Sequence, residues 1–311
     1  MNIDGSAAAA AAMRSRKNVG CYRIIIAGAS GLGKSTARQY LLHAWKKDRA
    51  GACAPSPEPR KTLEISTSDA IEIELRTTDS ERQEGRLRIV DTPGHGDCED
   101  ITQDIGKTTD YIEEQYDVLY HATNADGRVN PSHHDSLVTC CFHFIAPLRG
   151  CTDNDIAFMQ EVSKWVPIVP VIAQADKMTS EETSRFRKTV SDTLKQANIR
   201  CYDFGQDRQT LARCGFAQAR RARDDDPVAP DVLARVAAAG DPPVFTLIAD
   251  RREYAWGTCE MENADHSDFT LLRDLVIQGH LEVSVFLSWP GPLSLPAPCV
   301  PPSVVSGAAA S

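Results

Sequence analysis

The 311-residue sequence contains no apolar run that approaches the roughly 18 residues of a membrane-spanning helix. It also has no excess of positive charge, because 43 acidic residues outweigh 34 lysines and arginines and leave a net charge of −9. This balance disfavours a protein that binds nucleic acid by general electrostatic attraction. The first residues lack the basic and bulky apolar stretches of a signal peptide, and no internal repeat is present. We therefore expect a cytoplasmic protein without a nucleic-acid partner.

Disulfide and metal patterns are also missing among the ten cysteines. There is no CxxC pair, and no cysteine has a metal-ligand spacing with a histidine. Cys140 and Cys141 lie inside an apolar run, where cysteine behaves as a small hydrophobic residue. The sequence therefore predicts reduced thiols, as in cytosolic proteins.

The composition divides the chain into three parts. Residues 1–18 are rich in alanine and then basic, which predicts a poorly ordered arm. Residues 288–311 are rich in proline, serine, alanine and valine and have no periodicity, which predicts a disordered tail. We expect residues 19–287 between them to form one domain.

Short apolar segments alternate with helical patterns along this domain. The expected strands are residues 22–27, 70–75, 87–90, 139–145, 168–173 and 244–248, of which the second and third pair across a polar turn. A helix is expected to begin at Thr179, because Glu182 three residues later completes a capping box. Alternating strands and helices predict an α/β fold with three α/β/α layers and a mostly parallel sheet.

A glycine-rich segment follows the first expected strand and opens a helix. It reads GASGLGKST and fits the phosphate-loop pattern G-x-x-x-x-G-K-[ST], whose backbone N–H groups bind phosphate oxygens. Lys34 is expected to reach the β- and γ-phosphates, and the Ser35 hydroxyl to bind Mg²⁺. A glycine-rich turn with a chance lysine is the alternative, which the flanking strand and helix disfavour. The expected nucleotide contacts here are Gly28, Ser30, Gly31, Leu32, Gly33, Lys34, Ser35 and Thr36.

Two further motifs follow expected strands. Asp91-Thr-Pro-Gly94 places a carboxylate where it can hold the Mg²⁺ shell, and Gly94 can offer its backbone N–H to a γ-phosphate. Asp176, in Ala-Gln-Ala-Asp, can accept hydrogen bonds from the N1–H and N2–H₂ groups of guanine, a pattern that adenine lacks. Read alone, the first motif could be a tight turn and the second an ordinary acidic strand end. The order of the three motifs favours a GTP site.

Together these motifs resemble the septins, filament-forming GTPases related to small G proteins. The resemblance runs from about residue 20 to 279. It is carried by GASGLGKST, DTPGHGD, CCFHFIAP (140–147), DIAFMQEVSKWVPIVPVIAQAD (155–176), REYAWG (252–257) and ENADHSDFTLLRDLVI (262–277). Other phosphate-loop GTPases share the first two motifs and lack REYAWG.

The resemblance implies roles for residues that the motifs alone do not explain. Thr62 lies where GTP-hydrolysing septins keep a switch threonine that helps to order Mg²⁺ and the attacking water, with Thr67 as a rival. Arg252 corresponds to an arginine that packs on the base, and Trp256 to a tryptophan of the nucleotide-side subunit interface. Gln174 occupies the place of a base-packing lysine. Catalysis is then expected from Thr62, Lys34 and Gly94, and Mg²⁺ binding from Ser35, Thr62 and Asp91.

Several positions depart from the septin pattern. Ala29, His95, Gln174 and Ala249 replace a usual glutamate, an aromatic residue, a lysine and a glycine, respectively. The stretch before Arg252 is shorter than the usual β-meander, and we expect neither the usual last helix nor the coiled coil from residues 280–311.

The resemblance implies a cytoplasmic, cytoskeletal protein that hydrolyses GTP slowly to GDP and takes part in filament assembly and cell division. Its partners would be itself or other septins through the Trp256 region. Arg14, Arg16 and Lys17 resemble a thinned segment for weak contact with anionic membranes. Two alternatives stay open: a non-hydrolysing structural septin subunit, and a non-septin membrane-associated GTPase.

Overall fold

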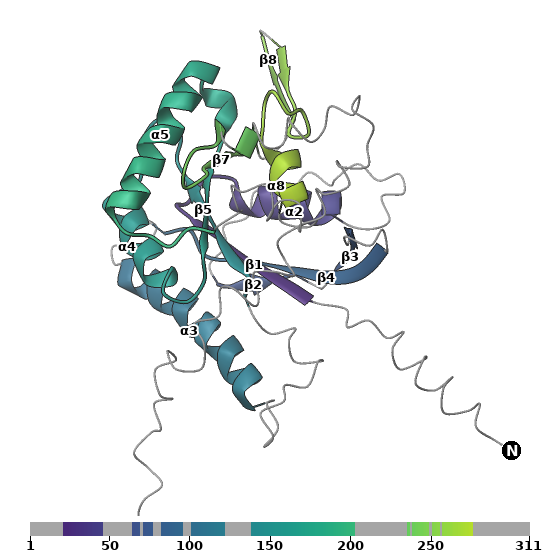
Figure 1. The fold of residues 1–311 in the computed structure, drawn as a ribbon, viewed down its shortest axis with the longest axis vertical. Coiled ribbons are helices and arrows are strands. Elements are labelled where there is room, and N and C mark those ends of the chain that lie inside the picture. Colours follow the sequence, from purple (N-terminus) through teal and green to yellow (C-terminus); the bar gives the residue numbers. More distant parts are fainter. Residues whose placement is uncertain are drawn as a thin grey trace, which may run out of the picture.

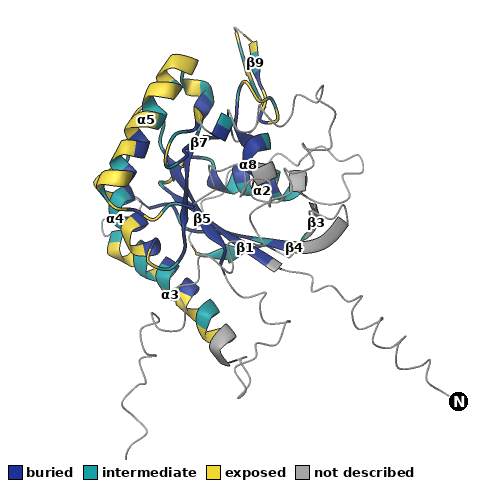
Figure 2. Cartoon of the chain, viewed as in Figure 1, coloured by how far each residue is buried: buried dark blue, intermediate teal, exposed yellow. Residues whose placement is uncertain are grey.

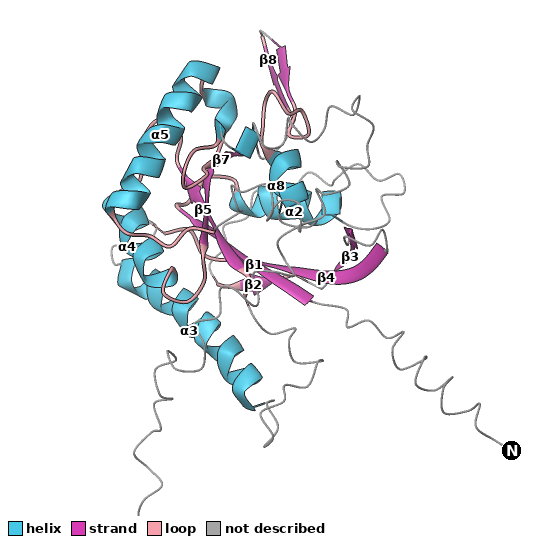
Figure 3. Cartoon of the chain, in the orientation of Figure 1, coloured by secondary structure: helices cyan, strands magenta, loops and turns pink. Residues whose placement is uncertain are grey.

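The computed structural model describes residues 21–45, 64–68, 71–76, 82–95, 101–121, 138–202, 235–236, 238–248, 251–255 and 257–275. Figure 1 shows the path of these residues, and Figure 3 separates their helices from their strands. The strands are β1 (Cys21–Gly28), β2 (Ser66–Thr67), β3 (Ile71–Arg76), β4 (Arg82–Asp91), β5 (Cys140–Ile145), β6 (Ile168–Ile172), β7 (Phe245–Thr246), β8 (Arg252–Tyr254) and β9 (Gly257–Cys259). The helices are α2 (Lys34–Trp45), α3 (Ile101–His121), α4 (Asp153–Val162), the short 3₁₀ helix η2 (Ala175–Lys177), α5 (Ser180–Gln196) and α8 (Phe269–Leu275).

Seven strands form one mixed sheet in the order β2-β4-β1-β5-β6-β7, with β3 also paired to β4. Strand β1 pairs in parallel with both β4 and β5, and the parallel order continues through β6 to β7. Strands β2 and β3 are antiparallel to β4, which confirms the expected hairpin. Strand β1 lies between β4 and β5 in the sheet. The chain continues from β1 to β4 on one side and then crosses to β5 on the other side, so the carboxyl end of β1 is a topological switch point. Ligands of open α/β sheets bind at such points.

Helices cover both faces of the sheet. Along β1 the side chains alternate: Ile24 and Ile26 join the core under α2 and α8, whereas Ile25 and Ala27 join the core under α3, α4 and α5. Figure 2 shows the buried strands, the exposed outer surfaces of α3, α4 and α5 on one face, and the mainly buried or intermediate residues of α2 and α8 on the other. This arrangement confirms the predicted three-layer α/β/α fold, and the buried thiols of Cys140 and Cys141 belong to its two cores.

Two helices on one face begin with capping boxes. At α5, the hydroxyl of Thr179 accepts from the backbone N–H of Glu182, and the Glu182 carboxylate accepts from Thr179 N, as the sequence predicts. At α4, Thr152 and Asp155 make the same exchange. The sequence contains this second [ST]-x-x-[DE] pattern as well, and it fixes Asp155 at the start of the helix.

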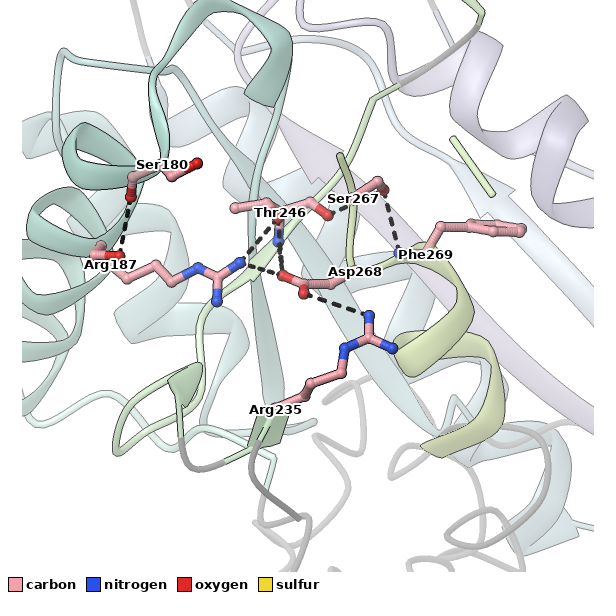
Figure 4. A network of polar contacts seen from close by, with 8 residues as sticks. Ser180, Arg187, Arg235, Thr246, Ser267, Asp268 and Phe269 are labelled. Atoms are coloured by element: carbon pink, nitrogen blue, oxygen red, sulfur yellow. Dashed lines mark hydrogen bonds and ion pairs between the residues drawn. The ribbon is translucent and has the colours of Figure 1, made fainter. Parts of the chain in front are cut away.

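A buried polar network joins α5, β7 and the start of α8 (Figure 4). The Asp268 carboxylate accepts from the backbone N–H and hydroxyl of Thr246, both at 2.8 Å, and from Arg187 at 2.5 Å. Arg235 lies 3.9 Å from the other carboxylate oxygen. The network ties the last strand of the sheet to the segment that follows it.

Some expectations lie outside the described residues. These are the N-terminal arm, the tail, and the boundaries of the domain at residues 19 and 287. The strand expected at residues 244–248 is formed only at Phe245–Thr246, while the neighbouring residues remain buried. No helix in the described parts of the chain is long and apolar enough to cross a membrane.

Candidate functional site

The glycine-rich segment turns sharply from β1 into α2, as the sequence predicts. Gly28 has φ +138°, and a Cβ atom there would lie 2.4 Å from the carbonyl oxygen of Phe144 on β5. Gly31 and Gly33 also have positive φ angles, of 78° and 82°. The turn therefore needs glycine both for its backbone conformation and for its close contact with the neighbouring strand.

The two polar side chains that open α2 face the loop and β4. Lys34 is 7% exposed, and its Nζ donates to the carbonyl oxygen of Ala29 at 2.9 Å. The hydroxyl of Ser35 donates to Oδ2 of Asp91 at 2.6 Å. The structure thus brings Lys34, Ser35 and Asp91 together at the carboxyl ends of β1 and β4. A hydroxyl beside a carboxylate is an oxygen donor set that suits Mg²⁺.

The segment after β4 packs directly against the glycine-rich turn. The backbone N–H and the hydroxyl of Thr92 both donate to the carbonyl oxygen of Ile26, at 3.1 and 3.0 Å. A Cβ atom at Gly94 would lie 2.7 Å from Cα of Ser30 and 3.0 Å from Nζ of Lys34. Only glycine fits this contact without a shift of backbone, so Gly94 lies beside the lysine expected to bind phosphate.

A second group of polar side chains lies beyond β6. Gln174 has a left-handed backbone, with φ 51° and ψ 47°, and its Nε2 donates to the carbonyl oxygen of Gly31 at 3.1 Å. Its Oε1 accepts from Nζ of Lys177 at 2.6 Å. Gln174 therefore links the segment that carries Asp176 to the glycine-rich turn.

The carboxylate of Asp176 is held on one side only. Its Oδ2 accepts from Nη1 of Arg252 at 3.0 Å and from the hydroxyl of Tyr254, both on β8. The hydrogen bond to Asp176 raises the pKa of Tyr254, so the phenol keeps its proton. The side chain of Asp176 has no exposed surface, and its Oδ1 has no hydrogen-bond partner among the described residues. A buried carboxylate oxygen without a partner is costly, and a ligand with N–H donors would satisfy it.

Comparison with known proteins tests whether the chain is a septin or another GTPase. The Septin family model matches residues 20–284. The chain belongs to the septin family. It is 33% identical to Septin-1 of Mus musculus over 266 residues, which are 84% of this chain and 68% of the mouse protein. It is 32% identical over 267 residues to Protein peanut of Drosophila melanogaster, covering 84% of this chain and 46% of peanut.

The structural comparison agrees with the sequence comparison. A crystal structure of the septin GTPase domain from Chlamydomonas reinhardtii matches with a TM-score of 0.60 and 25% identity. The match covers 87% of this chain and 94% of that chain. The chain thus contains a septin GTPase domain, from a family with a cytoskeletal role, and the non-septin alternative is excluded.

Two residues that the septin resemblance singled out, Thr62 and Trp256, lie outside the described residues, as does Ala249. Thr67, the rival of Thr62, lies on β2 opposite Val90, and its hydroxyl is 3.4 Å from the hydroxyl of Tyr111 on α3. The hydroxyl of Thr67 therefore faces a helix rather than a residue of the glycine-rich turn.

Two contacts of the septin site were missed by the sequence reasoning. The first is Tyr254 on Asp176, which REYAWG could have suggested as a second donor beside Arg252. The second is a buried cluster of His95, His143 and Asp155, although the sequence showed no metal-ligand spacing. These three residues are distant along the chain, and only the fold brings them together.

Proposed function

We propose that this septin binds GTP and GDP with Mg²⁺ between the glycine-rich turn and Asp176. The observation that carries this proposal is the buried Oδ1 of Asp176, which has no partner among the described residues while Arg252 and Tyr254 hold Oδ2. Guanine presents two N–H groups on one edge and can satisfy this oxygen and its neighbour, whereas adenine cannot. Gln174 connects this end to Gly31, so the base end and the phosphate end belong to one site.

The phosphate end suits the charge of a nucleoside triphosphate. Lys34 is a buried cation at the start of a helix, where the macrodipole and free N–H groups also favour an anion. Ser35, Asp91 and, by resemblance, Thr62 would hold Mg²⁺, which neutralises charge on the β- and γ-phosphates when it is bound.

Slow hydrolysis of GTP to GDP and phosphate follows from these groups. None of the side chains described at the phosphate end is an obvious strong general base, so we expect rate enhancement from positioning and from charge neutralisation. Lys34 and the backbone N–H of Gly94 are the groups that can stabilise negative charge on the γ-phosphate, since Gly94 packs against Lys34. Thr62 would order the attacking water.

Assembly is the role proposed for this activity. The hairpin of β8 and β9 projects from the domain beside the base end (Figure 1), and it carries both donors to Asp176. A nucleotide bound there would lie at the subunit interface that includes the Trp256 region, so its state would alter contacts with another septin. The cellular roles that fit are those of a cytoskeletal scaffold in the cytoplasm and in cell division. Arg14, Arg16 and Lys17 add at most a weak contact with anionic membranes.

A single-turnover assay tests hydrolysis. Purified protein is loaded with GTP and Mg²⁺, and the bound GTP and GDP are followed by chromatography. We expect slow conversion by the wild type, a slower rate for Thr62→Ala with GDP affinity preserved, and the wild-type rate for Thr67→Ala. Bound GTP that never converts would identify a structural subunit that holds nucleotide without turnover. Loss of rate in Thr67→Ala alone would assign the switch role to Thr67.

A further inference from the structure

A buried cluster joins the switch segment, residues 92–95 directly after β4, to helix α4. Nε2 of His95, which follows Gly94, lies 2.9 Å from Oδ1 of Asp155 at the start of α4. Nε2 of His143 on β5 lies 3.1 Å from the same oxygen. The two imidazole rings stack with centroids 5.2 Å apart, and Phe158 stacks on His95 at 5.0 Å. All three polar side chains are at most 4% exposed.

The carboxylate of Asp155 is satisfied by hydrogen bonds. Its Oδ2 accepts from the backbone N–H of Thr152 at 2.9 Å and from the Thr152 hydroxyl at 2.7 Å, while Oδ1 serves the two imidazoles. Burial alone would raise the pKa of Asp155, but the hydrogen bonds from His143, His95 and Thr152 outweigh it and lower the pKa well below its ordinary value. Asp155 is therefore ionised, and both imidazoles donate to it through Nε2–H.

The same ligand types could hold a transition metal, but the surroundings favour hydrogen bonds. A metal bound to Nε2 moves the ring proton to Nδ1, and histidines that bind metal nearly always donate that second N–H to an acceptor. The Nδ1 atoms of His95 and His143 are buried and have no partner among the described residues. A proton at either Nδ1 would have no acceptor among the described residues, so the form with its proton on Nε2 is the more stable one.

His95 contacts the phosphate end with its backbone while its side chain contacts α4. The carbonyl oxygen of His95 accepts from the backbone N–H of Ser30 at 3.2 Å, and His95 forms a parallel bridge with Ala29. The adjacent Gly94 packs on Ser30 and Lys34. His143, in contrast, lies within β5, where its backbone pairs with Ala27 of β1. Of the two histidines, His95 alone belongs to the segment that carries the switch glycine.

We propose that His95 is a positioning residue for the γ-phosphate. By donating to Asp155, His95 fixes the backbone of Gly94 against the glycine-rich turn and couples the switch segment to the start of α4. This inference rests on the proposed function, because it assigns the side chain that sets where Gly94 meets a γ-phosphate. It concerns His95, a position where this chain departs from the usual septin pattern.

The test compares the affinities for a non-hydrolysable GTP analogue and for GDP, measured by calorimetry with Mg²⁺. His95→Phe keeps the ring and its stacking but removes the donor, and His95→Gln keeps an amide donor at a similar reach. His143→Phe is the matched control, because it removes a donor from the same oxygen, keeps a ring beside His95 and lies on β5, outside the switch segment. We expect His95→Phe to lower the affinity for the analogue roughly three- to tenfold relative to the affinity for GDP, which is the effect of one lost hydrogen bond. His95→Gln should restore most of the wild-type ratio of analogue affinity to GDP affinity, and His143→Phe should keep that ratio.

Each other outcome overturns the inference. A wild-type ratio in His95→Phe would show that the hydrogen bond does not position Gly94. An equal change in His143→Phe would show only a general loss of stability, which thermal unfolding of both variants measures. One equivalent of zinc in the purified wild type, lost in both variants, would make the cluster a metal site. Wild-type protein that binds neither nucleotide would instead contradict the proposed function itself.

Discussion

The two ends of the proposed nucleotide site are built in different ways. At the phosphate end, one contiguous segment of nine residues joins a central strand to a helix, and close backbone contacts at Gly28 and Gly94 fix it. At the base end, Asp176 depends on side chains of β8 and on Gln174, which reaches back to Gly31. The phosphate end is therefore rigid because of its backbone, whereas the base end is held by side-chain hydrogen bonds that single substitutions can remove.

Removal of the cation at the phosphate end should have the largest effect. Lys34→Ala is expected to abolish binding of both GTP and GDP, because the phosphates lose a buried positive partner. Thermal unfolding with GDP at a hundredfold excess over the Kd should then lack the stabilisation of about 2.7 kcal/mol that a bound ligand gives. Lys188→Ala, an exposed lysine on α5, is the control and should bind normally. Normal nucleotide content in Lys34→Ala would remove the phosphate site from this account.

A change at the base end should spare the phosphates and alter selectivity. Asp176→Asn is expected to lower the affinity for GDP about a hundredfold or more, because two hydrogen bonds from guanine to the carboxylate are weakened or lost. ADP affinity should change little, so the preference for GDP over ADP should nearly disappear. The control is Asp192→Asn on the exposed side of α5. If Asp176→Asn keeps the wild-type preference in competition titrations, another residue reads the base.

Low pH should lower the free energy of unfolding of the domain, because the histidine His143 is buried in the core beneath the proposed phosphate site. Burial lowers the pKa of His143, and the charge of Lys34 lowers it further, although the hydrogen bond and charge of Asp155 raise it. The unfolded chain therefore binds a proton below the ordinary histidine pKa of 6.5 that the folded chain does not bind. Stability should fall as the pH drops from 6.5 toward the lower folded pKa, by up to about 1.4 kcal/mol per pH unit.

Urea unfolding between pH 7.5 and 5.5 measures this slope, and His143→Phe should have a shallower one. Equal slopes for the two proteins would show that His143 does not titrate differently on folding. The lowered pKa of Asp155 acts at a different range, since its stabilisation is lost only as the pH falls below the ordinary aspartate pKa of 3.8.

The smallest expected effect concerns the link between the two ends. Gln174→Lys should raise the affinity for GDP roughly two- to fivefold, because the methylene chain and ammonium group of a lysine can pack across the base. Nζ of Lys177 lies 2.6 Å from Oε1 of Gln174, so a lysine at 174 would meet a like charge. The gain should therefore be larger in a Lys177→Ala background. Weaker binding in both backgrounds would mean that the hydrogen bond from Gln174 to Gly31 matters more than contact with the base.

The sequence predicted the fold and the sharp turn from β1 into α2 well because their signals are local. The strand patterns around residues 22–27 and 168–173 and the capping box at Thr179 depend on neighbours in the chain, and the structure confirms them. The hydrogen bond from Tyr254 to Asp176 and the contacts of His95 with Asp155 depend on which strands lie side by side. No spacing rule along the chain contains that information. Gln174 takes the place of a base-packing lysine in the septin pattern, and the sequence did not predict that its amide donates to Gly31 in the glycine-rich turn.

The most direct test of the central claim is the identity of the nucleotide that accompanies the purified protein. The protein is denatured after gel filtration, and the released small molecules are separated by ion-exchange chromatography against nucleotide standards. A guanine-specific site predicts GDP or GTP close to one equivalent per chain, with none in Lys34→Ala. Adenine nucleotide in its place, or nucleotide-free protein that also fails to take up added GDP with Mg²⁺, would contradict the account.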